Sequence, residues 1–375
     1  MPFRALALLL TGLFGVSACD AAPTDAGPSD DGEVGAQVAP NGAVVLQYHF
    51  VAEDTPRSTS VTPAELEAHL EHLAEHSFRV EPLDALLAQL QAGEDPPPRT
   101  VAITFDDGYR SVYTAAFPLL RERDLPFTIF VNPEAVDGGS RTFATWEQLR
   151  EMQEAGALIA NHGTSHAYLA RRDPEAPRES EATFEARMEA ELLAAERRIE
   201  AETGRSPKLL AYAYGEYDDR IRAWLRQRGW IGMGQHSGAV WSGSDFTALP
   251  RFPFSGAYAD LEDFAEKVRM RPLPVLEATS LPDPTSATDT SRPTLRLTLP
   301  ASDFDPARVA CFASGQGAIP TELVEAGPPA RVEARAPAPV PVGRSRYNCT
   351  APTRDGHWRW FSQPWLRLAS DMPAD

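Results

Sequence analysis

Short apolar runs alternate with amphipathic segments between residue 43 and about residue 271. Each run has the length of one buried strand, and the segments between the runs are long enough for helices. Strands and helices in alternation indicate an α/β fold, with a parallel sheet and helical crossovers. Seven such units favour a barrel or a strongly curved sheet over an open sheet. The runs are Val44–Tyr48, Val101–Phe105, Phe127–Val131, Leu158–Ala160, Leu209–Ala213, Trp230–Met233 and Ala248–Phe252.

Several predicted helices carry recognisable start and stop signals. Thr62-Pro63-Ala64-Glu65 forms a capping box with proline at the first helical position, and Thr145-Trp146-Glu147-Gln148 begins another helix. A long charged helix is expected from about Glu179 to Thr203, where Gly204 ends it. The histidines of the first helix are expected to be exposed to solvent; they are His69, His72 and His76.

The pattern changes near residue 272. Residues 272–293 are rich in Pro, Thr, Ser and Asp, which indicates a linker or an extended edge. Thr294–Leu299 then alternates between polar and apolar positions with period two, and further strand-like segments follow it. We therefore expect a small antiparallel β domain over residues 294–375.

The first residues resemble a bacterial export signal. Arg4 precedes an apolar stretch from Ala5 to Val16, and small residues then lead to Cys19. Small residues before a cysteine resemble the lipobox of bacterial lipoproteins, so residues 1–19 are predicted to be a signal peptide that ends at a lipidated Cys19. A plain signal peptide with an incidental cysteine is the alternative. Residues 20–42 have the composition of a flexible tether.

The three cysteines fit this interpretation. Cys311 and Cys349 can pair in an oxidising compartment, which leaves Cys19 as the odd one. Two unpaired, buried thiols are the alternative for the pair.

Composition narrows the choice of partners. The chain has 375 residues, with 35 Lys and Arg against 53 Asp and Glu, so its formal net charge is −18. A surface this acidic argues against binding to nucleic acid or to anionic lipid. No stretch approaches the roughly 20 apolar residues that span a bilayer. We expect a monomer that meets the membrane only through its lipid anchor.

Polar residues follow the predicted strands at their carboxyl ends. In a barrel of parallel strands these ends meet on one rim, which is where active sites lie. Residues that are far apart in the sequence are therefore expected to share one cleft. They are His49, Asp106, Asp107, Asn132, His162, His166, Tyr214, Gln235 and His236, with Arg251 inside the last run.

Four of these residues have the chemistry of a metal site. Asp106 and Asp107 are adjacent carboxylates, whose mutual repulsion a bound cation would relieve. His162 and His166 are four residues apart, so on a helical turn both imidazoles would face one way. One Asp and two His leave a coordination position open for water, as in hydrolytic metal centres. Alone, the pair Asp106 and Asp107 would indicate only a turn, and the pair His162 and His166 only surface histidines.

Three segments around these residues resemble the motifs of a known family. Thr104-Phe105-Asp106-Asp107-Gly108-Tyr109 resembles the first motif of the polysaccharide deacetylases, carbohydrate esterase family 4. His162-Gly163-Thr164-Ser165-His166 is similar to the second motif. Tyr212-Ala213-Tyr214-Gly215-Glu216-Tyr217 resembles the third motif in its Tyr-Pro-Tyr-Gly variant. The resemblance covers about residues 43–270 and implies a distorted barrel of seven or eight β/α units.

The resemblance also implies roles for the motif residues. Asp106 would be the general base, and Asp107, His162 and His166 would bind a divalent metal ion. The ion is expected to be Zn²⁺, with Co²⁺, Ni²⁺ or Fe²⁺ as alternatives. The backbone N–H of Tyr214 would help to hold the oxyanion of the transition state.

The sequence departs from the family pattern in several places, among them Gly163 where Ser or Thr is usual and Ala213 where Pro is usual. The arginine that normally precedes the third motif is Ala211 here, and Arg251 is the candidate that replaces it in orienting the base. The family's last motif, which carries a histidine, is missing from the sequence. His236 is therefore our first candidate for the general acid and His49 the second, and either could be only a hydrogen-bonding residue of the rim.

These observations predict a metal-dependent enzyme that removes N-acetyl groups from a polysaccharide containing N-acetylhexosamine. The polymer would be an exopolysaccharide, a chitin-like polymer or a cell-wall glycan, and the enzyme would be anchored to the bacterial envelope and face the periplasm, at either membrane. Two other functions stay open, a catalytically weak glycan-binding module of an export assembly and an O-acetyl esterase. Trp358, Trp360 and Trp365 of the β domain would either stack on sugars or pack in a core.

Overall fold

A curled parallel sheet forms the centre of the first two thirds of the chain. The structure, a computed structural model, describes residues 38–171, 179–205, 207–281 and 291–367, which all belong to one unit of the chain. The strand order is β10-β1-β5-β6-β7-β8-β9, with β4 also paired to β5, and every neighbouring pair is parallel. The strands are β1 (Ala43–Tyr48), β4 (Arg79–Val80), β5 (Thr100–Phe105), β6 (Thr128–Val131), β7 (Leu158–Asn161), β8 (Leu209–Ala211), β9 (Ile231–Met233) and β10 (Phe252–Pro253).

The sheet closes on itself through a short irregular segment. Leu249 forms a parallel bridge with Met233 of β9, and Phe252 pairs with Leu46 of β1. Pro250 and Pro253 have no N–H groups to donate, so this segment does not form a regular strand along its whole length. The predicted distorted barrel of parallel strands is therefore confirmed.

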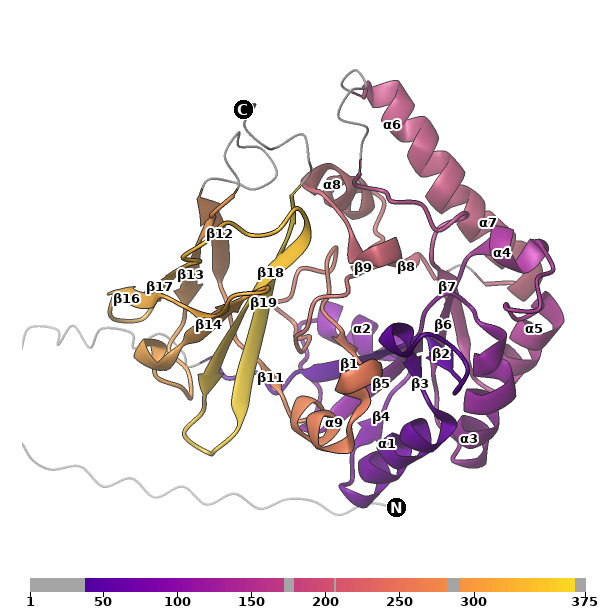
Figure 1. The fold of residues 1–375 in the computed structure, drawn as a ribbon, viewed down its shortest axis with the longest axis horizontal. Helices are drawn as coiled ribbons and strands as arrows, with labels where there is room; N and C mark the ends of the chain where they lie inside the picture. The colour runs from indigo at the N-terminus through magenta and orange to yellow at the C-terminus, as the bar shows by residue number, and fades with distance from the viewer. Residues whose placement is uncertain (1–37, 172–178, 206, 282–290, 368–375) are drawn as a thin grey trace, which may run out of the picture. The chain divides into compact units, whose positions relative to one another are not determined.

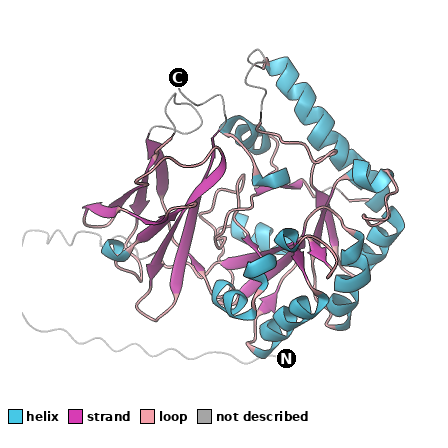
Figure 2. Ribbon diagram, in the orientation of Figure 1, coloured by secondary structure: helices cyan, strands magenta, loops and turns pink. Residues whose placement is uncertain are grey.

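Helices surround this sheet (Figures 1 and 2). The capping box predicted at Thr62 is present, the helix predicted to begin at Thr145 also has one, and the predicted long helix ends at Gly204 in the left-handed conformation. The helices are α1 (Pro63–Glu75), α2 (Leu83–Gln91), α3 (Phe117–Glu122), α4 (Pro133–Asp137), α5 (Trp146–Glu154), α6 (Glu181–Met188), α7 (Ala194–Thr203), α8 (Asp219–Gln227) and α9 (Leu261–Lys267). Two π-helical stretches, Val112–Ala116 and Glu189–Leu193, precede α3 and join α6 to α7, and four 3-10 turns lie at Arg57–Thr59, Ala213–Gly215, Gly256–Ala259 and Pro306–Arg308. A two-stranded sheet pairs β2 (Phe50–Val51) with β3 (Ser60–Val61).

The two faces of the barrel strands belong to different cores. Ala43, Val45 and Ala102 pack with the four leucines of α2, whereas the alternating residues Val44 and Ile103 pack with α1, α3 and α5. On β1 and β5 the residues of this face, Ala43, Val45 and Ala102, are small, and this leaves room for the leucines of α2. The polar side chains of the rim lie at the carboxyl end of this same face.

The expectation that the histidines of α1 are exposed is wrong for two of the three. His69 is 1% exposed, hydrogen bonds to the hydroxyl of Tyr48 and the carbonyl of Ala259, and stacks on the ring of Phe264 at 4.0 Å. His72 is also buried. Helix α9 covers this side of α1, and burial lowers the pKa of His69 to about 4, so its ring stays neutral at neutral pH. The sequence of α1 alone does not reveal this packing partner.

The described residues after the barrel form two sheets, whose neighbouring strands are antiparallel as expected, except that β11 pairs parallel with β19. One sheet has the order β11-β19-β18-β14-β15 and the other the order β12-β13-β17-β16. Their apolar faces share one core, which includes Leu297, Val332, Tyr347 and Trp365. The strands are β11 (Arg271–Pro272), β12 (Glu277–Leu281), β13 (Thr294–Leu299), β14 (Ala310–Ala313), β15 (Gly317–Ile319), β16 (Thr321–Glu325), β17 (Ala330–Arg335), β18 (Gly343–Pro352) and β19 (Trp358–Arg367).

Both predicted connecting segments are more ordered than their composition indicates. Within residues 272–293, β12 pairs antiparallel with β13, so this part is an edge strand and not a linker. At the end of the predicted tether, the N–H of Val38 donates to the carbonyl of Ala301, and Arg359 donates to the carbonyl of Pro40. The described residues of the tether are therefore bound to the C-terminal sheets. The composition of residues 20–42 predicted a flexible tether because composition carries no information about such long-range partners, whereas the extended edge was one of the two alternatives for residues 272–293.

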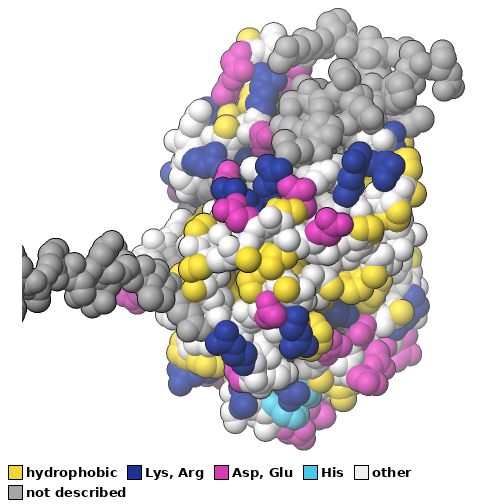
Figure 3. Space-filling model, turned by 90° about the vertical axis from the view of Figure 1, so that its left-hand side faces the viewer, with side chains coloured by type: hydrophobic (Ala, Val, Ile, Leu, Met, Phe, Trp, Pro, Cys, Tyr) yellow, Lys and Arg dark blue, Asp and Glu magenta, His cyan; other side chains and the backbone are white. Residues whose placement is uncertain are grey.

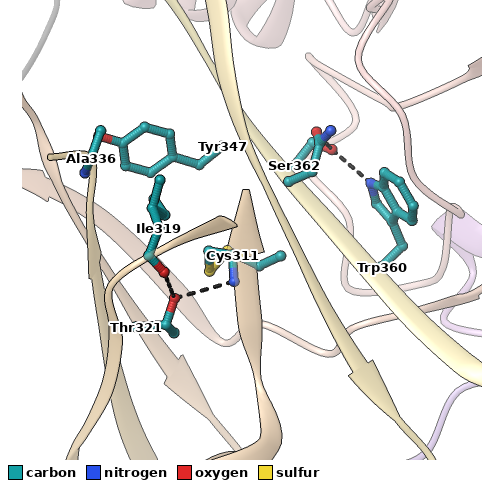
Figure 4. The surroundings of a disulfide bond; sticks show 9 residues. Cys311, Ile319, Thr321, Ala336, Tyr347, Trp360 and Ser362 are labelled. Carbon is teal, nitrogen blue, oxygen red and sulfur yellow. Dashed lines mark hydrogen bonds between the residues drawn. A yellow bond between two sulfur atoms is a disulfide. The ribbon is translucent and has the colours of Figure 1, made fainter. Parts of the chain in front are cut away.

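Cys311 and Cys349 form the expected disulfide, which joins β14 to β18 (Figure 4). Both cysteines are buried, and the N–H of Cys311 donates to the hydroxyl of Thr321. Figure 4 shows Trp360 and Ser362 on the other side of the paired strands from the disulfide.

Removing this disulfide is expected to destabilise the C-terminal sheets. The two cysteines are 38 residues apart, and closing a loop of this length stabilises the folded state by roughly 3–4 kcal/mol. The double variant Cys311→Ser/Cys349→Ser should lose about this free energy of unfolding in denaturant titrations. A reductant should lower the stability of the wild type to that of the variant without affecting the variant itself. Equal stability of the two proteins under oxidising conditions would contradict this expectation.

The three tryptophans of β19 have different environments. Trp365 is 4% exposed and packs edge-on against Tyr347, so it belongs to the core. Trp360 is half-buried against Phe252 of the barrel, and Trp358 is 44% exposed. Figure 3 shows a face of the molecule on which hydrophobic side chains are interspersed with charged ones of both signs.

The predicted signal peptide and Cys19 lie outside the described residues. Among the helices that the structure describes, none has the length and apolar character to cross a membrane.

Candidate metal centre and active site

Asp107, His162 and His166 converge at the carboxyl ends of the barrel strands. Asp107 follows β5, and the two histidines follow β7. Oδ1 of Asp107 lies 3.1 Å from Nε2 of His162 and 3.2 Å from Nε2 of His166. One potential ligand atom from each residue lies within 4.8 Å of the others. The three residues that the sequence assigns to a metal are thus brought together.

The donor atoms fit a cation. Oδ1 of Asp107 and Nε2 of His162 are buried and have no hydrogen-bond partner, although they lie only 3.1 Å apart. A buried polar atom without a partner costs about 1–3 kcal/mol. Carboxylate oxygen and imidazole nitrogen are the ligands that Zn²⁺ and related divalent ions prefer. A divalent ion between the three side chains would satisfy these atoms together.

The electrostatics of the cluster favour added positive charge. Burial alone would raise the pKa of Asp107, but His162 and His166 hold it well below its ordinary value. Burial would lower the pKa of His162, yet the two aspartates raise it overall. A field that favours a proton on His162 also favours a metal cation beside it.

The two histidines approach each other in a different way from the one expected. Residues 162–166 form a loop, so the proposed helical turn is wrong. Gly163 has φ +80° and His166 has φ +61°. Two residues in the left-handed region turn the chain sharply enough for both rings to face Asp107. Glycine adopts this region without strain, which accounts for Gly163 at this position of the motif.

Three residues of the site have strained backbone conformations. Asp107 and Tyr214, like His166, are non-glycine residues with positive φ, at 69° and 59°. Such residues are uncommon, and their conformation persists only where the surrounding structure fixes it. Three residues of the predicted site therefore hold strained conformations that orient their groups toward the same rim.

Hydrogen bonds hold the loop of residues 162–166 in place. Nδ1 of His162 bonds to the carbonyl of Ala211, so its Nε2 carries the lone pair that faces Asp107. The side-chain amide of Asn132 donates to the carbonyls of His162 and Gly163. Asn161 Oδ1 accepts from the N–H of Gly163. Asn132 and Asn161 thus fix the backbone of residues 162 and 163, beside the candidate metal ligands.

Asp106 lies beside the cluster, clamped by Arg251. Nη1 and Nη2 of Arg251 donate to the two carboxylate oxygens of Asp106 at 2.7 and 2.8 Å, and both side chains are fully buried. Gln47 donates from Nε2 to Oδ2 of Asp106 at 2.6 Å. Burial raises the pKa of Asp106, but Arg251, His162 and His49 outweigh it and lower the pKa to about 2. The carboxylate is therefore ionised and fixed in orientation.

Gln47 was not identified from the sequence. It is the one strongly polar side chain among the residues of β1, Ala-Val-Val-Leu-Gln-Tyr, and it is 1% exposed. A buried amide in an apolar strand needs a partner, and this signal could have identified it as part of the site.

The two candidate general acids lie in different places. Nε2 of His49 is 3.8 Å from Oδ2 of Asp106, so His49 lies at the cluster. The ring of His236 lies near Tyr217, 6.3 Å between centroids, and lines a separate cavity of about 640 Å³ between the barrel and the C-terminal sheets. Burial and nearby arginines lower the pKa of His236 to about 3. The structure therefore places His49, but not His236, beside Asp106.

Tyr214 and an open cavity complete the rim. The ring of Tyr214 packs edge-on against His166 at 4.4 Å and stacks on Tyr168 at 3.7 Å. A cavity of about 340 Å³ reaches Asp107 and His166 and is also lined by Tyr109, Asn132, Glu134, Ala135, Phe143 and Ser165. The cluster is thus accessible from solvent through a partly aromatic opening.

The fold and this site together define a β/α barrel with a candidate hydrolytic metal centre at its rim. Residues 93–230 match the family model described as polysaccharide deacetylase. The predicted resemblance is thereby confirmed.

Similar proteins support this assignment. YxkH of Bacillus subtilis (strain 168) is 32% identical over 126 residues, 33% of this chain and 43% of that protein. The chain thus spans less than half of this relative. The poly-beta-1,6-N-acetyl-D-glucosamine N-deacetylase of Staphylococcus epidermidis is 25% identical over 231 residues, 56% of this chain and 78% of that protein. The structure of IcaB from Ammonifex degensii superimposes with a TM-score of 0.53 at 23% identity, over 62% of this chain and all of that one, which shows a common fold.

Proposed function

We propose that this protein hydrolyses N-acetyl groups of a polysaccharide that contains N-acetylhexosamine. The observation that supports this most strongly is the convergence of Asp107, His162 and His166 directly beside the clamped carboxylate of Asp106. The named activity of the Staphylococcus epidermidis relative favours a β-1,6-linked N-acetylglucosamine polymer as the substrate.

The proposed chemistry requires a divalent metal ion, for which Asp107, His162 and His166 are the ligands. When bound, an ion such as Zn²⁺ polarises a carbonyl group and lowers the pKa of water from about 15.7 toward about 7. Asp106 accepts the proton of the attacking water on its carboxylate, which Arg251 and Gln47 hold in place. The backbone N–H of Tyr214 donates to the oxyanion that forms at the acetamide carbonyl.

The departing amine needs a proton, and we assign its transfer to His49. Its Nε2 lies 3.8 Å from Oδ2 of Asp106. A proton that Asp106 accepts from water can therefore pass over a short distance to His49, which then donates it to the leaving nitrogen. The products are acetate and a free amine, and water supplies the atoms that balance the cleavage. We also propose that Cys19 anchors the protein to the bacterial envelope, on the basis of the sequence before it.

Acetate release from a panel of purified polymers tests this function. With Zn²⁺ or Co²⁺ supplied, the wild type should release acetate from poly-β-1,6-N-acetylglucosamine or chitooligosaccharides. Release only from acetylated xylan would identify an O-acetyl esterase. Glycan binding without release from any polymer would identify a binding module, and either of these results would overturn the proposal.

A further inference from the structure

A residue of the C-terminal sheets reaches the loop that carries Tyr214. Nη1 of Arg344, at the start of β18, donates to the carbonyl of Tyr214 at 2.5 Å. The same nitrogen lies 3.5 Å from Oε1 of Gln235, and Nε of Arg344 lies 3.7 Å from Oε1 of Glu216. One guanidinium thus faces three groups around this loop.

The loop has a conformation that needs such support. Tyr214 has φ 59° and ψ 2°, in the left-handed region that disfavours a side chain as bulky as tyrosine. Gly215 follows with φ +69°, and a Cβ there would lie 2.6 Å from Cβ of Gln235. The loop is therefore both strained and tightly packed. Strain of about 1–3 kcal/mol persists only where surrounding contacts hold it.

Glu216 connects this loop to a second arginine. Its side chain is fully buried and accepts hydrogen bonds from Nε and Nη2 of Arg171 at 2.8 and 2.6 Å. The guanidinium of Arg171 also covers the ring of Tyr168, which stacks on Tyr214. The loop is thus held from the barrel side by Arg171 and from the C-terminal sheets by Arg344.

We propose that Arg344 is a positioning residue that holds the Tyr214 N–H in place for catalysis. The carbonyl and the N–H of Tyr214 extend from one Cα, so fixing the carbonyl at these dihedral angles also fixes the N–H. The proposal rests on the proposed function, in which this N–H stabilises the oxyanion. It assigns a role to the C-terminal sheets, which complete the rim of the catalytic barrel by supplying Arg344.

The kinetic test compares Arg344→Ala and Arg344→Lys with the wild type in acetate release. Loss of one oxyanion donor costs about 10²–10³-fold in kcat, and a displaced donor should cost about 10-fold. Arg344→Ala should therefore lower kcat about 10-fold with little change in KM, and lysine, which can still donate to the carbonyl, should restore part of the loss. Arg331→Ala is the matched control, because it breaks an exposed ion pair with Glu325 and should leave kcat unchanged.

Hydrogen exchange provides a readout that does not depend on activity. The amides of residues 214–216 should exchange faster in Arg344→Ala than in the wild type and in Arg331→Ala, at unchanged melting temperature, because the side chain of Arg344 is 53% exposed. Unchanged exchange at these amides, or an unchanged kcat, would overturn the role of Arg344. If the wild type released no acetate from any glycan, the proposed function would fail, and the exchange result would still decide whether Arg344 orders the loop.

Discussion

Replacing Asp106 with asparagine is expected to lower kcat for acetate release by about 10²–10⁴-fold, the usual contribution of a general base. Asparagine keeps the size of the side chain and its contact with Gln47 but cannot accept the proton of the attacking water. The proposed metal ligand Asp107 is untouched, so bound zinc per chain should stay at the wild-type level. Steady-state kinetics and elemental analysis of the same preparation measure both quantities.

This substitution also breaks a buried ion pair, and a matched control separates stability from catalysis. Asp106→Asn leaves the fully buried Arg251 without its counter-charge, which typically destabilises a protein by about 3–5 kcal/mol. Asp303→Asn breaks a similar pair, because Asp303 accepts two hydrogen bonds from the buried Arg359. Asp303→Asn should lose stability and keep its kcat. A similar loss of kcat in both variants would show that Asp106 acts only through stability.

Replacing His162 with glutamine is expected to abolish zinc binding and acetate release together. The buried His162 supplies one of three converging ligand atoms, and the ion would contribute several kcal/mol of transition-state stabilisation. A loss of that size lowers kcat at least about 1000-fold. Zinc titration by calorimetry and acetate release measure the two effects in one protein preparation.

His357→Gln is the control for zinc binding. His357 lies in the turn between β18 and β19 and is not part of the cluster, so zinc affinity and kcat should equal those of the wild type. Wild-type zinc affinity in His162→Gln would show that the ion is bound elsewhere.

The sequence predicts the barrel and its rim well because both depend on local patterns. Apolar runs such as Val101–Phe105 identify buried strands, and polar residues placed directly after them must meet on one edge. The sequence also predicts Asp107, His162 and His166 as one set, since few other arrangements explain these residue types at the carboxyl ends of strands in one parallel sheet. The helical turn was wrong because a spacing of four does not distinguish a helix from a loop with two left-handed residues.

The contacts that join distant segments could not be predicted from local patterns. His69 is buried because α9 covers α1, and Pro40 is bound because Arg359 reaches it from β19. Arg344 donates to the carbonyl of Tyr214 across 130 residues of sequence. Each of these contacts depends on how helices and strands pack against one another, and the local sequence pattern does not indicate that packing.

Anomalous diffraction from wild-type crystals soaked with zinc tests the central claim most directly. The account predicts one strong peak within about 2.0–2.2 Å of Oδ1 of Asp107 and of Nε2 of His162 and His166, the usual zinc–ligand distances. It also predicts that this peak disappears in crystals of His162→Gln. Zinc bound only at other residues, with Asp107 and the two imidazoles free of density between them, would contradict the account.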